Sequence, residues 1–278
     1  MNILEFSSLV FLGSLLAGFL GAATDLGGGV VIVPLLALGF GVDIRYAMGA
    51  SLVSVIATSS AAASAYVKEG FSNIRVGMFL EIATTVGAVA GAAVATSISP
   101  SAIAVVFGLV LIYSAYQSGF SRHKDAQPSE PDKLATRLRM NSEYPTPEGP
   151  KSYYVRAVPQ GFGIMFLAGA LSGLLGIGSV ALKVIALDQV MRLPFKVSAT
   201  TSNFMIGVTA AASAGVFLNR GYVDPGLAMP VMLGVLLGSL AGAHFLLGAS
   251  TKMLRIVFAV VIFALAAEML YMGLTGGL

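Results

Sequence analysis

DLGGGVVIVP, residues 25–34, interrupts an apolar run close to the start of the chain. A glycine inside a helix costs about 1 kcal/mol relative to alanine, so the adjacent Gly27, Gly28 and Gly29 predict a broken helix. Backbone N–H groups freed by the break, with the positive end of the next half-helix, favour an anion in a protected cavity. Close helix packing through small residues is the alternative, and it suits spaced glycines such as Gly87 and Gly91, or Gly238 and Gly242, better.

The composition around this break is that of a membrane protein. Of the 278 residues, 56% are hydrophobic and only 10% are charged, which is too little charge to cover a soluble domain of this length. A helix needs about 20 apolar residues to cross the hydrocarbon core. Against that length the chain divides into apolar segments at 4–24, 27–42, 46–67, 76–98, 101–119, 157–175, 178–191, 197–218, 225–248 and 252–274.

The second segment of each set of five is short and begins with glycine, so we expect a half-helix or a re-entrant element there. The sequence thus predicts an all-α polytopic membrane protein with eight to ten crossings.

The two sets of segments are related in sequence. Gly18 and Gly169 lie 151 positions apart, and the same spacing pairs Arg45 with Lys196, Ser51 with Ser202, Thr58 with Thr209, and Gly70-Phe71 with Gly221-Tyr222. Because glycine matches are frequent in membrane sequences, the Arg45/Lys196 and Gly-aromatic pairs carry most weight. We expect an internal duplication, with 1–119 and 157–278 as two transmembrane repeats.

The segment between the repeats, 120–156, is rich in charge and proline. It holds seven of the 16 Lys and Arg residues, five of the 13 Asp and Glu residues and five of the 11 prolines. Its few large apolar residues are too few to form a domain core. We expect a flexible, basic, cytoplasmic loop; a docking or regulatory segment is the alternative.

Basic residues in the short loops indicate the orientation, since Lys and Arg are enriched on the cytoplasmic side. With five crossings per repeat the repeats are inverted, and the residues then placed inside are Lys68, Arg75, Arg192, Lys196, Lys252 and Arg255. Only Arg45 and Arg220 lie outside. Parallel repeats of four crossings would move Arg192, Lys196, Lys252 and Arg255 outside, so inverted repeats are favoured.

The second glycine break is Gly176-Ile177-Gly178-Ser179, and Lys183 follows it by one turn. A lysine in the middle of a membrane segment costs a few kcal/mol unless it is paired or hydrated, roughly 2.5–3.5 at the bilayer centre. Lys183 is therefore a candidate for the fixed charge that binds an anionic substrate, with Gly178 and Ser179 as backbone donors. An ion pair with Asp188 and snorkelling to the interface are the structural alternatives.

Polar side chains begin the third segment of each repeat. Ser51 occupies this place in the first repeat, and Thr201, Ser202 and Asn203 occupy it in the second. Their hydroxyl and amide groups suit the oxygens of an oxyanion, and an unpartnered amide such as Asn203 is expensive in lipid. Hydroxyls can also bond to their own helix carbonyls without any functional role.

Two acids, Asp25 and Glu81, are candidates for proton coupling, since carboxyl groups in apolar stretches can exchange protons near neutral pH. For Glu81 and Glu268 the alternative is contact with lipid headgroups from a segment end, which we prefer for Glu268.

Several functions are disfavoured by missing residues. The sequence has no cysteine, no GxSxG or HExxH motif, and only two histidines, His123 and His244. We therefore expect no metal, no cofactor and no catalytic residues. The net charge of +3 is not gathered on a basic face with aromatic residues, so no nucleic-acid partner is expected.

The chain resembles the sulfite exporter TauE/SafE family, also called toluene sulfonate uptake permeases. The matching motifs are Gly27-Gly28-Gly29 before Pro34, Gly49-Ala50-Ser51-Leu52 and Tyr66-Val67-Lys68-Glu69-Gly70-Phe71, with weaker copies at Gly176-Ile177-Gly178-Ser179, Thr201-Ser202-Asn203 and Asn219-Arg220-Gly221-Tyr222. The resemblance implies a secondary transporter, often an exporter, that moves sulfite, sulfonates such as sulfoacetate, or related small anions across a bacterial inner membrane.

This sequence departs from the family pattern in two places. Asp25 stands where the glycine run usually extends, and the second repeat lacks both the full glycine cluster and a proline matching Pro34. Asp25 and Lys183 are therefore candidate specificity determinants. A passive anion channel is the alternative function, because the same groups can line a pore, and a membrane-embedded hydrolase is the weaker one.

The predicted topology can be tested by labelling. A cysteine introduced at Ser129 should react with an impermeant maleimide only from the cytoplasm, and a cysteine at Ser99 only from outside, without interference from native thiols. Labelling of both positions from the same side would contradict inverted repeats with a cytoplasmic central loop.

Overall fold

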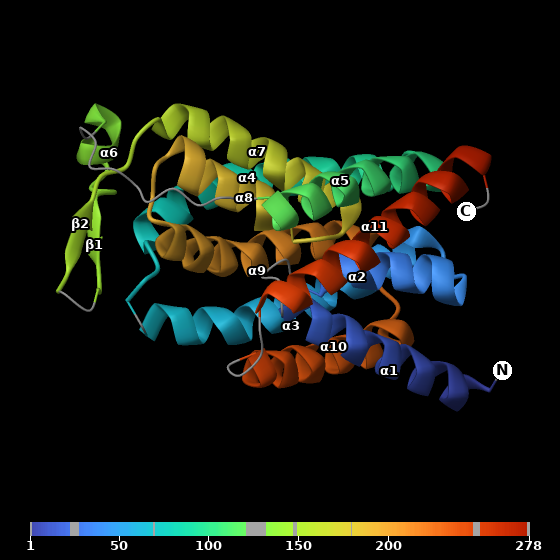
Figure 1. Ribbon diagram of the computed structural model, residues 1–278. Helices are drawn as coiled ribbons and strands as arrows, with labels where there is room; N and C mark the ends of the chain where they lie inside the picture. Colours follow the sequence, from blue (N-terminus) through green and yellow to red (C-terminus); the bar gives the residue numbers. More distant parts are fainter. Residues whose placement is uncertain are drawn as a thin grey trace.

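The computed structural model describes residues 2–22, 28–68, 70–120, 132–146, 149–178, 180–246 and 251–276 (Figure 1). Its elements, in chain order, are α1 (Ile3–Ala22), α2 (Gly29–Pro34) with the π-helical turn η1 (Leu35–Gly39), α3 (Ile44–Lys68), α4 (Ile74–Ala95), α5 (Pro100–Phe120), α6 (Lys133–Arg137), β1 (Ser142–Tyr144), β2 (Lys151–Tyr153), α7 (Val158–Leu175), α8 (Val180–Ile185) with η2 (Ala186–Val190), α9 (Phe195–Asn219), α10 (Pro225–Leu246) and α11 (Thr251–Thr275).

The prediction of an all-α polytopic membrane protein is confirmed. Five of the described helices are long and apolar enough to cross a bilayer. Large apolar side chains also point out of the bundle, among them Leu16, Ile82 and Phe263, which are 63%, 59% and 58% exposed. Exposed apolar side chains of this size suit contact with lipid.

The second element of each half is short, as expected from its Gly-led sequence. The regular helix α2 has six residues and η1 adds five, and α8 with η2 repeats the same lengths. At about 1.5 Å of rise per residue such an element covers roughly half of a 30 Å hydrocarbon core.

The helix bounds of the two halves recur at the spacing seen in the sequence. Helix α3 covers 44–68 and α9 covers 195–219, while α4 covers 74–95 and α10 covers 225–246, so each bound is displaced by 151 positions. The turns recur as well: Gly70 and Gly221 precede α4 and α10 with φ of 75° and 76°, a left-handed conformation that favours glycine. This explains why the Gly-aromatic pair is repeated.

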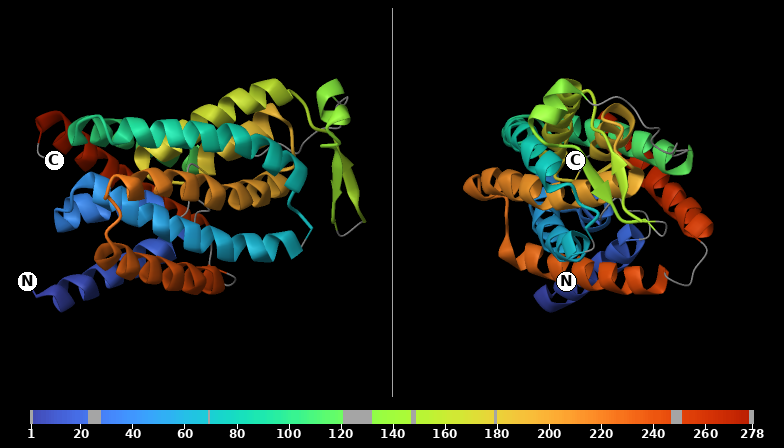
Figure 2. Two further views of the ribbon diagram at one scale, coloured as in Figure 1. Left: turned by 180° about the vertical axis from the view of Figure 1, so that it is seen from behind. Right: turned by 90° about the vertical axis from the view of Figure 1, so that its left-hand side faces the viewer.

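Helices of one half pack on helices of the other half throughout the bundle. Helix α1 packs on α10 and α7 packs on α4, while α3 packs on α9 and α5 on α11. Every one of these contacts joins one half to the other. Both termini lie at one end of the bundle and the β1–β2 hairpin lies at the other (Figures 1 and 2), so the halves run through the bundle in opposite directions.

Spaced glycines allow these helices to approach closely. A Cβ on Gly87 or Gly91 of α4 would overlap the carbonyl oxygen of Phe166 or Ala170 in α7, and a Cβ on Gly238 of α10 would overlap the Leu15 carbonyl in α1. The packing interpretation of these glycines therefore agrees with the structure.

The central segment differs from the flexible tether that we expected. In its described part, α6 is capped by the Asp132 side chain, and β1 pairs with β2 in an antiparallel hairpin. Met140, Tyr153 and Val155 are buried in one cluster with the first turns of α4 and α7. The expectation is wrong for these residues because a few apolar side chains suffice to anchor a segment on an existing core.

Polar contacts strengthen this anchor. Asn73, which caps α4, donates from Nδ2 to the Met140 carbonyl at 2.8 Å and to the Tyr153 hydroxyl at 2.7 Å. Burial raises the pKa of the Tyr153 phenol, so the hydroxyl stays neutral at physiological pH. The hairpin is therefore joined to the start of α4 by hydrogen bonds as well as by apolar contact.

The close packing of α4 and α7 predicts a contrast between two glycines of α7. A Cβ on Gly173 would overlap the Ala88 carbonyl oxygen, whereas nothing lies within 4 Å of a Cβ on Gly163. Gly173→Ala should lower the free energy of unfolding by about 1–3 kcal/mol through overpacking. Gly163→Ala should leave it unchanged or raise it by up to about 1 kcal/mol through helix propensity. Equal melting temperatures for the two variants in detergent would contradict this packing.

Candidate functional site

The two glycine breaks meet in the middle of the bundle. A Cβ on Gly29 would lie 2.9 Å from Val55 Cγ2 and 3.9 Å from the Cα of Ile177. A Cβ on Gly178 would lie 3.3 Å from Val55 Cγ1 and 2.6 Å from Ile206 Cγ2. Both breaks therefore contact the same residue of α3, although they come from opposite halves of the chain.

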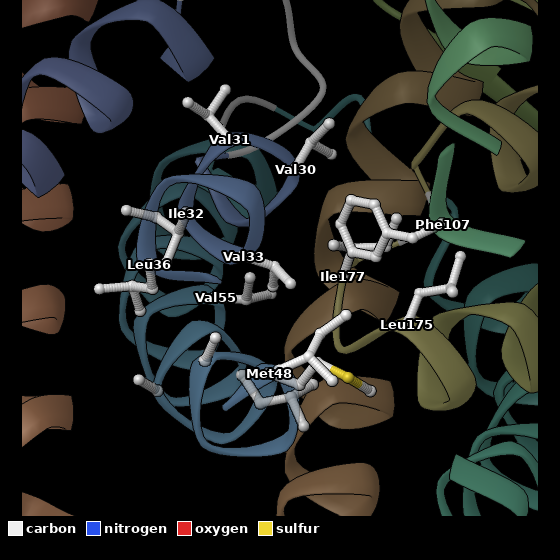
Figure 3. Close-up of a cluster of buried hydrophobic side chains, with 14 of the residues drawn as sticks. Val30, Val31, Ile32, Val33, Leu36, Met48, Val55, Phe107, Leu175 and Ile177 are labelled. Atoms are coloured by element: carbon white, nitrogen blue, oxygen red, sulfur yellow. The ribbon is translucent and has the colours of Figure 1, made fainter. Parts of the chain in front are cut away.

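The junction between the breaks is filled by apolar side chains. Val30 and Val33 of the first break lie near Ile177 of the second, with Val55, Phe107 and Leu175 around them (Figure 3). A Cβ at position 29 would crowd Ser51 and Val55 of its own half. A Cβ at position 178 would crowd Ile206 and Val55, whose side chains must shift to make room.

A fully buried lysine lies within this interior. Lys183 of α8 is 0% exposed, and its Nζ donates a hydrogen bond of 2.7 Å to the Thr209 hydroxyl in α9. The opposite charge that attracts it is the carboxylate of Glu81 in α4. Snorkelling is therefore wrong for Lys183, since no part of the side chain reaches the surface.

Thr209 connects the lysine to the acid. Its Oγ1 lies 2.8 Å from Glu81 Oε1 and 2.9 Å from the Met205 carbonyl. Glu81 Oε1 also accepts from the Thr85 hydroxyl at 3.2 Å, and Glu81 is only 8% exposed. The headgroup alternative for Glu81 is thus wrong, because its carboxylate points into the bundle rather than toward lipid.

Two buried side-chain oxygens, one on α4 and one on α9, lack hydrogen-bond partners among the described residues. They are Oε2 of Glu81 and Oγ of Ser202, which is 0% exposed on α9. Ser202 and Thr209 are seven residues apart and so share one face of their helix. Buried polar atoms without a hydrogen bond are rare, so each of these two oxygens is a candidate contact for a ligand or a water molecule.

A comparison with protein families matches residues 10–269 to the family described as "Sulfite exporter TauE/SafE". The chain belongs to the sulfite exporter TauE/SafE family. This TauE/SafE protein is accordingly a multi-pass membrane transporter, and the bacterial inner membrane is the location that agrees with its relatives.

Two of those relatives come from Bacillus subtilis (strain 168). "Probable membrane transporter protein YunE" is 28% identical over 278 residues, covering 98% of this chain and 99% of the relative. "Probable membrane transporter protein YdhB" is 27% identical over 238 residues, covering 85% and 87%. No solved structure matches this TauE/SafE protein.

The predicted site residues that the structure describes fall into two groups, the glycine junction with Ser51 and the buried pair Lys183 and Glu81. Gly29 and Gly178 lie at the junction, and Ser51 is fully buried beside Gly29, with its Oγ 3.4 Å from the Gly29 carbonyl oxygen. Gly28 instead faces Val235 of α10, whose Cγ1 lies 2.7 Å from the position of a Cβ. Asp25, Gly27 and Ser179 lie outside the described residues. Glu268, in contrast, is exposed on α11, which agrees with the expected contact with lipid headgroups.

Two predicted binding residues have other surroundings. The Thr201 hydroxyl accepts a 3.0 Å hydrogen bond from the backbone N–H of Asn73, so it supports the start of α4. Asn203 is only half-buried. The sequence did not single out Thr209 for a role, although its pairing with Thr58 in the repeat was visible; its position opposite Glu81 depends on the packing of α4 against α9.

Cation–π contacts explain the strongest repeat pair. The Arg45 guanidinium lies 5.5 Å from the Tyr222 ring centroid, and the Lys196 ammonium lies 5.5 Å from the Phe71 centroid. Each contact joins one half of this TauE/SafE protein to the other. Because α3 begins at the end with the termini and α9 begins at the hairpin end, the two contacts lie toward opposite ends of the bundle (Figure 1).

The junction can be tested by a disulfide, since the chain has no native cysteine. Cysteines replacing Val55 and Gly178 should form a bond, because a Cβ at 178 lies 3.3 Å from the Val55 side chain. After proteolytic cleavage within 120–156, the two halves should stay joined on a non-reducing gel. Val55→Cys with Gly163→Cys is the control that should separate; separation of both pairs would contradict the junction.

Proposed function

We propose that this protein is a secondary transporter of small sulfur-containing or organic anions, such as sulfite and sulfonates including sulfoacetate, coupled to protons and acting as an exporter when the anion accumulates inside. The observation that carries the proposal is the fully buried ammonium of Lys183. A buried charge is energetically costly, and charged residues inside membrane segments commonly mark substrate pathways. An anion is the ligand that matches an ammonium group.

Lysine rather than a helix end supplies the positive charge. Helices α2 and α8 have only six regular residues each, so their dipoles are weak. The ammonium of Lys183 provides donors that match the oxygens of a sulfite or sulfonate group. The Ser202 hydroxyl, on the same face of α9 as Thr209, is a second candidate donor along the path of the anion. Backbone donors at Gly28, Gly29 and Gly178 complete the proposed site.

The packing of helices of one half on helices of the other supports an inverted duplication and, with it, alternating access. In such transporters one repeat rocks against the other around a central site. Alternating access requires the central site to be closed toward each membrane face in turn. The cation–π contacts of Arg45 and Lys196, at opposite ends of the bundle, are the candidate gates. The apolar side chains that fill the junction favour this carrier over a passive anion channel, which requires a continuous polar path.

Flux measurements test the function directly. Proteoliposomes containing the protein should transport sulfite or sulfoacetate, with a rate that depends on a pH gradient, and taurine should compete less well because it carries an additional positive charge. Flux that is conductive and insensitive to the pH gradient would favour the channel instead.

The role of Lys183 predicts a large loss of affinity on neutralisation. A charge-assisted hydrogen bond contributes about 1.5–3 kcal/mol, so Lys183→Met should weaken anion binding by about one to two orders of magnitude. Lys183→Arg should have a smaller effect, and Lys133→Met, at an exposed position of α6, should have none. Calorimetric titration of the purified variants with sulfite measures the affinities.

A double variant separates substrate binding from structural pairing. If Lys183 only balances the charge of Glu81, Lys183→Met with Glu81→Gln should recover both folding and binding, since removing both members of a buried pair is often tolerated. If Lys183 holds the anion, the double variant should fold and still fail to bind. Unchanged affinity in Lys183→Met would remove this residue from the site.

A further inference from the structure

We propose that the chain has a single proton-linked anion site, on one side of its pseudo-symmetry, in which the Glu81 carboxylate and the transported anion compete for Lys183 and Thr209 mediates between them. This inference rests on the proposed function and specifies how the proton and the anion are coupled. It depends on three elements from the two halves: α4 supplies Glu81, while α8 and α9 supply Lys183 and Thr209.

The hydrogen bonds around Thr209 make it a mediator. Its hydroxyl accepts from Lys183 Nζ at 2.7 Å and has one proton to give, for which Glu81 Oε1 at 2.8 Å and the Met205 carbonyl at 2.9 Å compete. When Glu81 is ionised, the Thr209 hydroxyl proton points to the carboxylate, and the negative charge of Glu81 balances the positive charge of Lys183. When Glu81 is protonated, the hydroxyl can turn to Met205, and the lysine charge is no longer balanced.

Protonation of Glu81 therefore creates the condition for anion binding. The carboxylate binds one solvated proton from the aqueous phase, and its Oε2, which has no hydrogen-bond partner among the described residues, has room for it. The positive charge of Lys183 then attracts an anion through an interior that screens poorly. No other bond forms or breaks, so one proton and one anion enter the site together and leave together.

Few other charged groups lie near Glu81. On α4 itself the charged neighbour is Arg75, which is exposed at the hairpin end and donates to the Arg139 carbonyl. Helix α7, which packs on α4, has no titratable side chain in its sequence, and α9 carries only the exposed Lys196 on Phe71. Asp188 follows α8 in η2. The Lys183–Thr209–Glu81 group is thus the titratable centre of this part of the bundle.

The repeat shows that this group is present only once. At the 151-residue spacing, Glu81 corresponds to Met232 and Lys183 to Ile32, whereas Thr209 corresponds to Thr58. The Thr58 hydroxyl bonds to the Ser54 and Val55 carbonyls of its own helix, at 3.0 and 3.3 Å. The two halves therefore provide two similar places, of which one has charges and one has none, and the inferred ratio is one proton per anion.

The test measures anion affinity against pH with sulfoacetate, whose charge stays constant between about pH 5.5 and 8. Wild type should bind more tightly as pH falls, by at most about tenfold per pH unit for one linked proton. Glu81→Gln imitates the protonated acid, so it should bind tightly at high pH and lose the pH dependence. Thr209→Val removes a donor to the carboxylate, so the midpoint of the curve should move to higher pH.

Thr58→Val is the matched control and should leave the curve of the wild type unchanged. A pH-indicator measurement on wild type should also show proton uptake on sulfoacetate binding, which requires no variant to fold. Absence of that uptake would overturn the inference, as would normal pH dependence in Glu81→Gln, loss of pH dependence in Asp25→Asn instead, or equal effects of Thr58→Val and Thr209→Val.

These outcomes are separate from failure of the proposed function. If wild type binds no sulfite or sulfonate, the proposed function fails and the inference fails with it. If wild type binds and Lys183→Met does not, while Glu81→Gln retains the pH dependence, the proposed function stands and only this coupling is overturned.

Discussion

The hydrogen bond from Lys183 to Thr209 imposes conditions that the surrounding helices must meet. An ammonium group without exposed surface needs both an acceptor and a counter-charge, because hydrocarbon supplies neither. The acceptor comes from α9 and the counter-charge from Glu81 on α4, so three elements must be held at hydrogen-bond distance. The cost of failing to do so is that of an uncompensated buried charge, roughly 3–5 kcal/mol.

Small residues make that arrangement possible. The glycines of α4 and α7 bring the backbones of these helices into contact, which fixes the position of Glu81 on α4 relative to the second half of the chain. Lipid offers no hydrophobic drive between helices, so this contact depends on close van der Waals packing. The same close packing joins α1 to α10, so these contacts also connect one half to the other.

The scaffold follows the internal repeat, whereas the charged residues of the proposed site do not. The scaffold is repeated: helix bounds, left-handed glycine turns and cation–π contacts all occur twice. The charges of the site occur once, on one side of the repeat. In transporters built from repeats, a repeated scaffold gives the bundle two related arrangements. The anion site that we propose has its charges on one side of the repeat.

The sequence by itself determined the membrane class and the repeat, and it singled out Lys183 as a candidate, because apolar length, fixed spacing and an isolated charge are properties of the chain that can be seen without coordinates. Tertiary structure alone decided the partners. Thr209 lies 26 residues from Lys183 and 128 from Glu81, and no local periodicity relates such positions. The anchored hairpin was missed for the same reason: Met140 and Tyr153 look too few to fold until α4 and α7 provide the surface that buries them. Local patterns predict which segments enter the bilayer, whereas contacts between distant segments are set by how the helices pack.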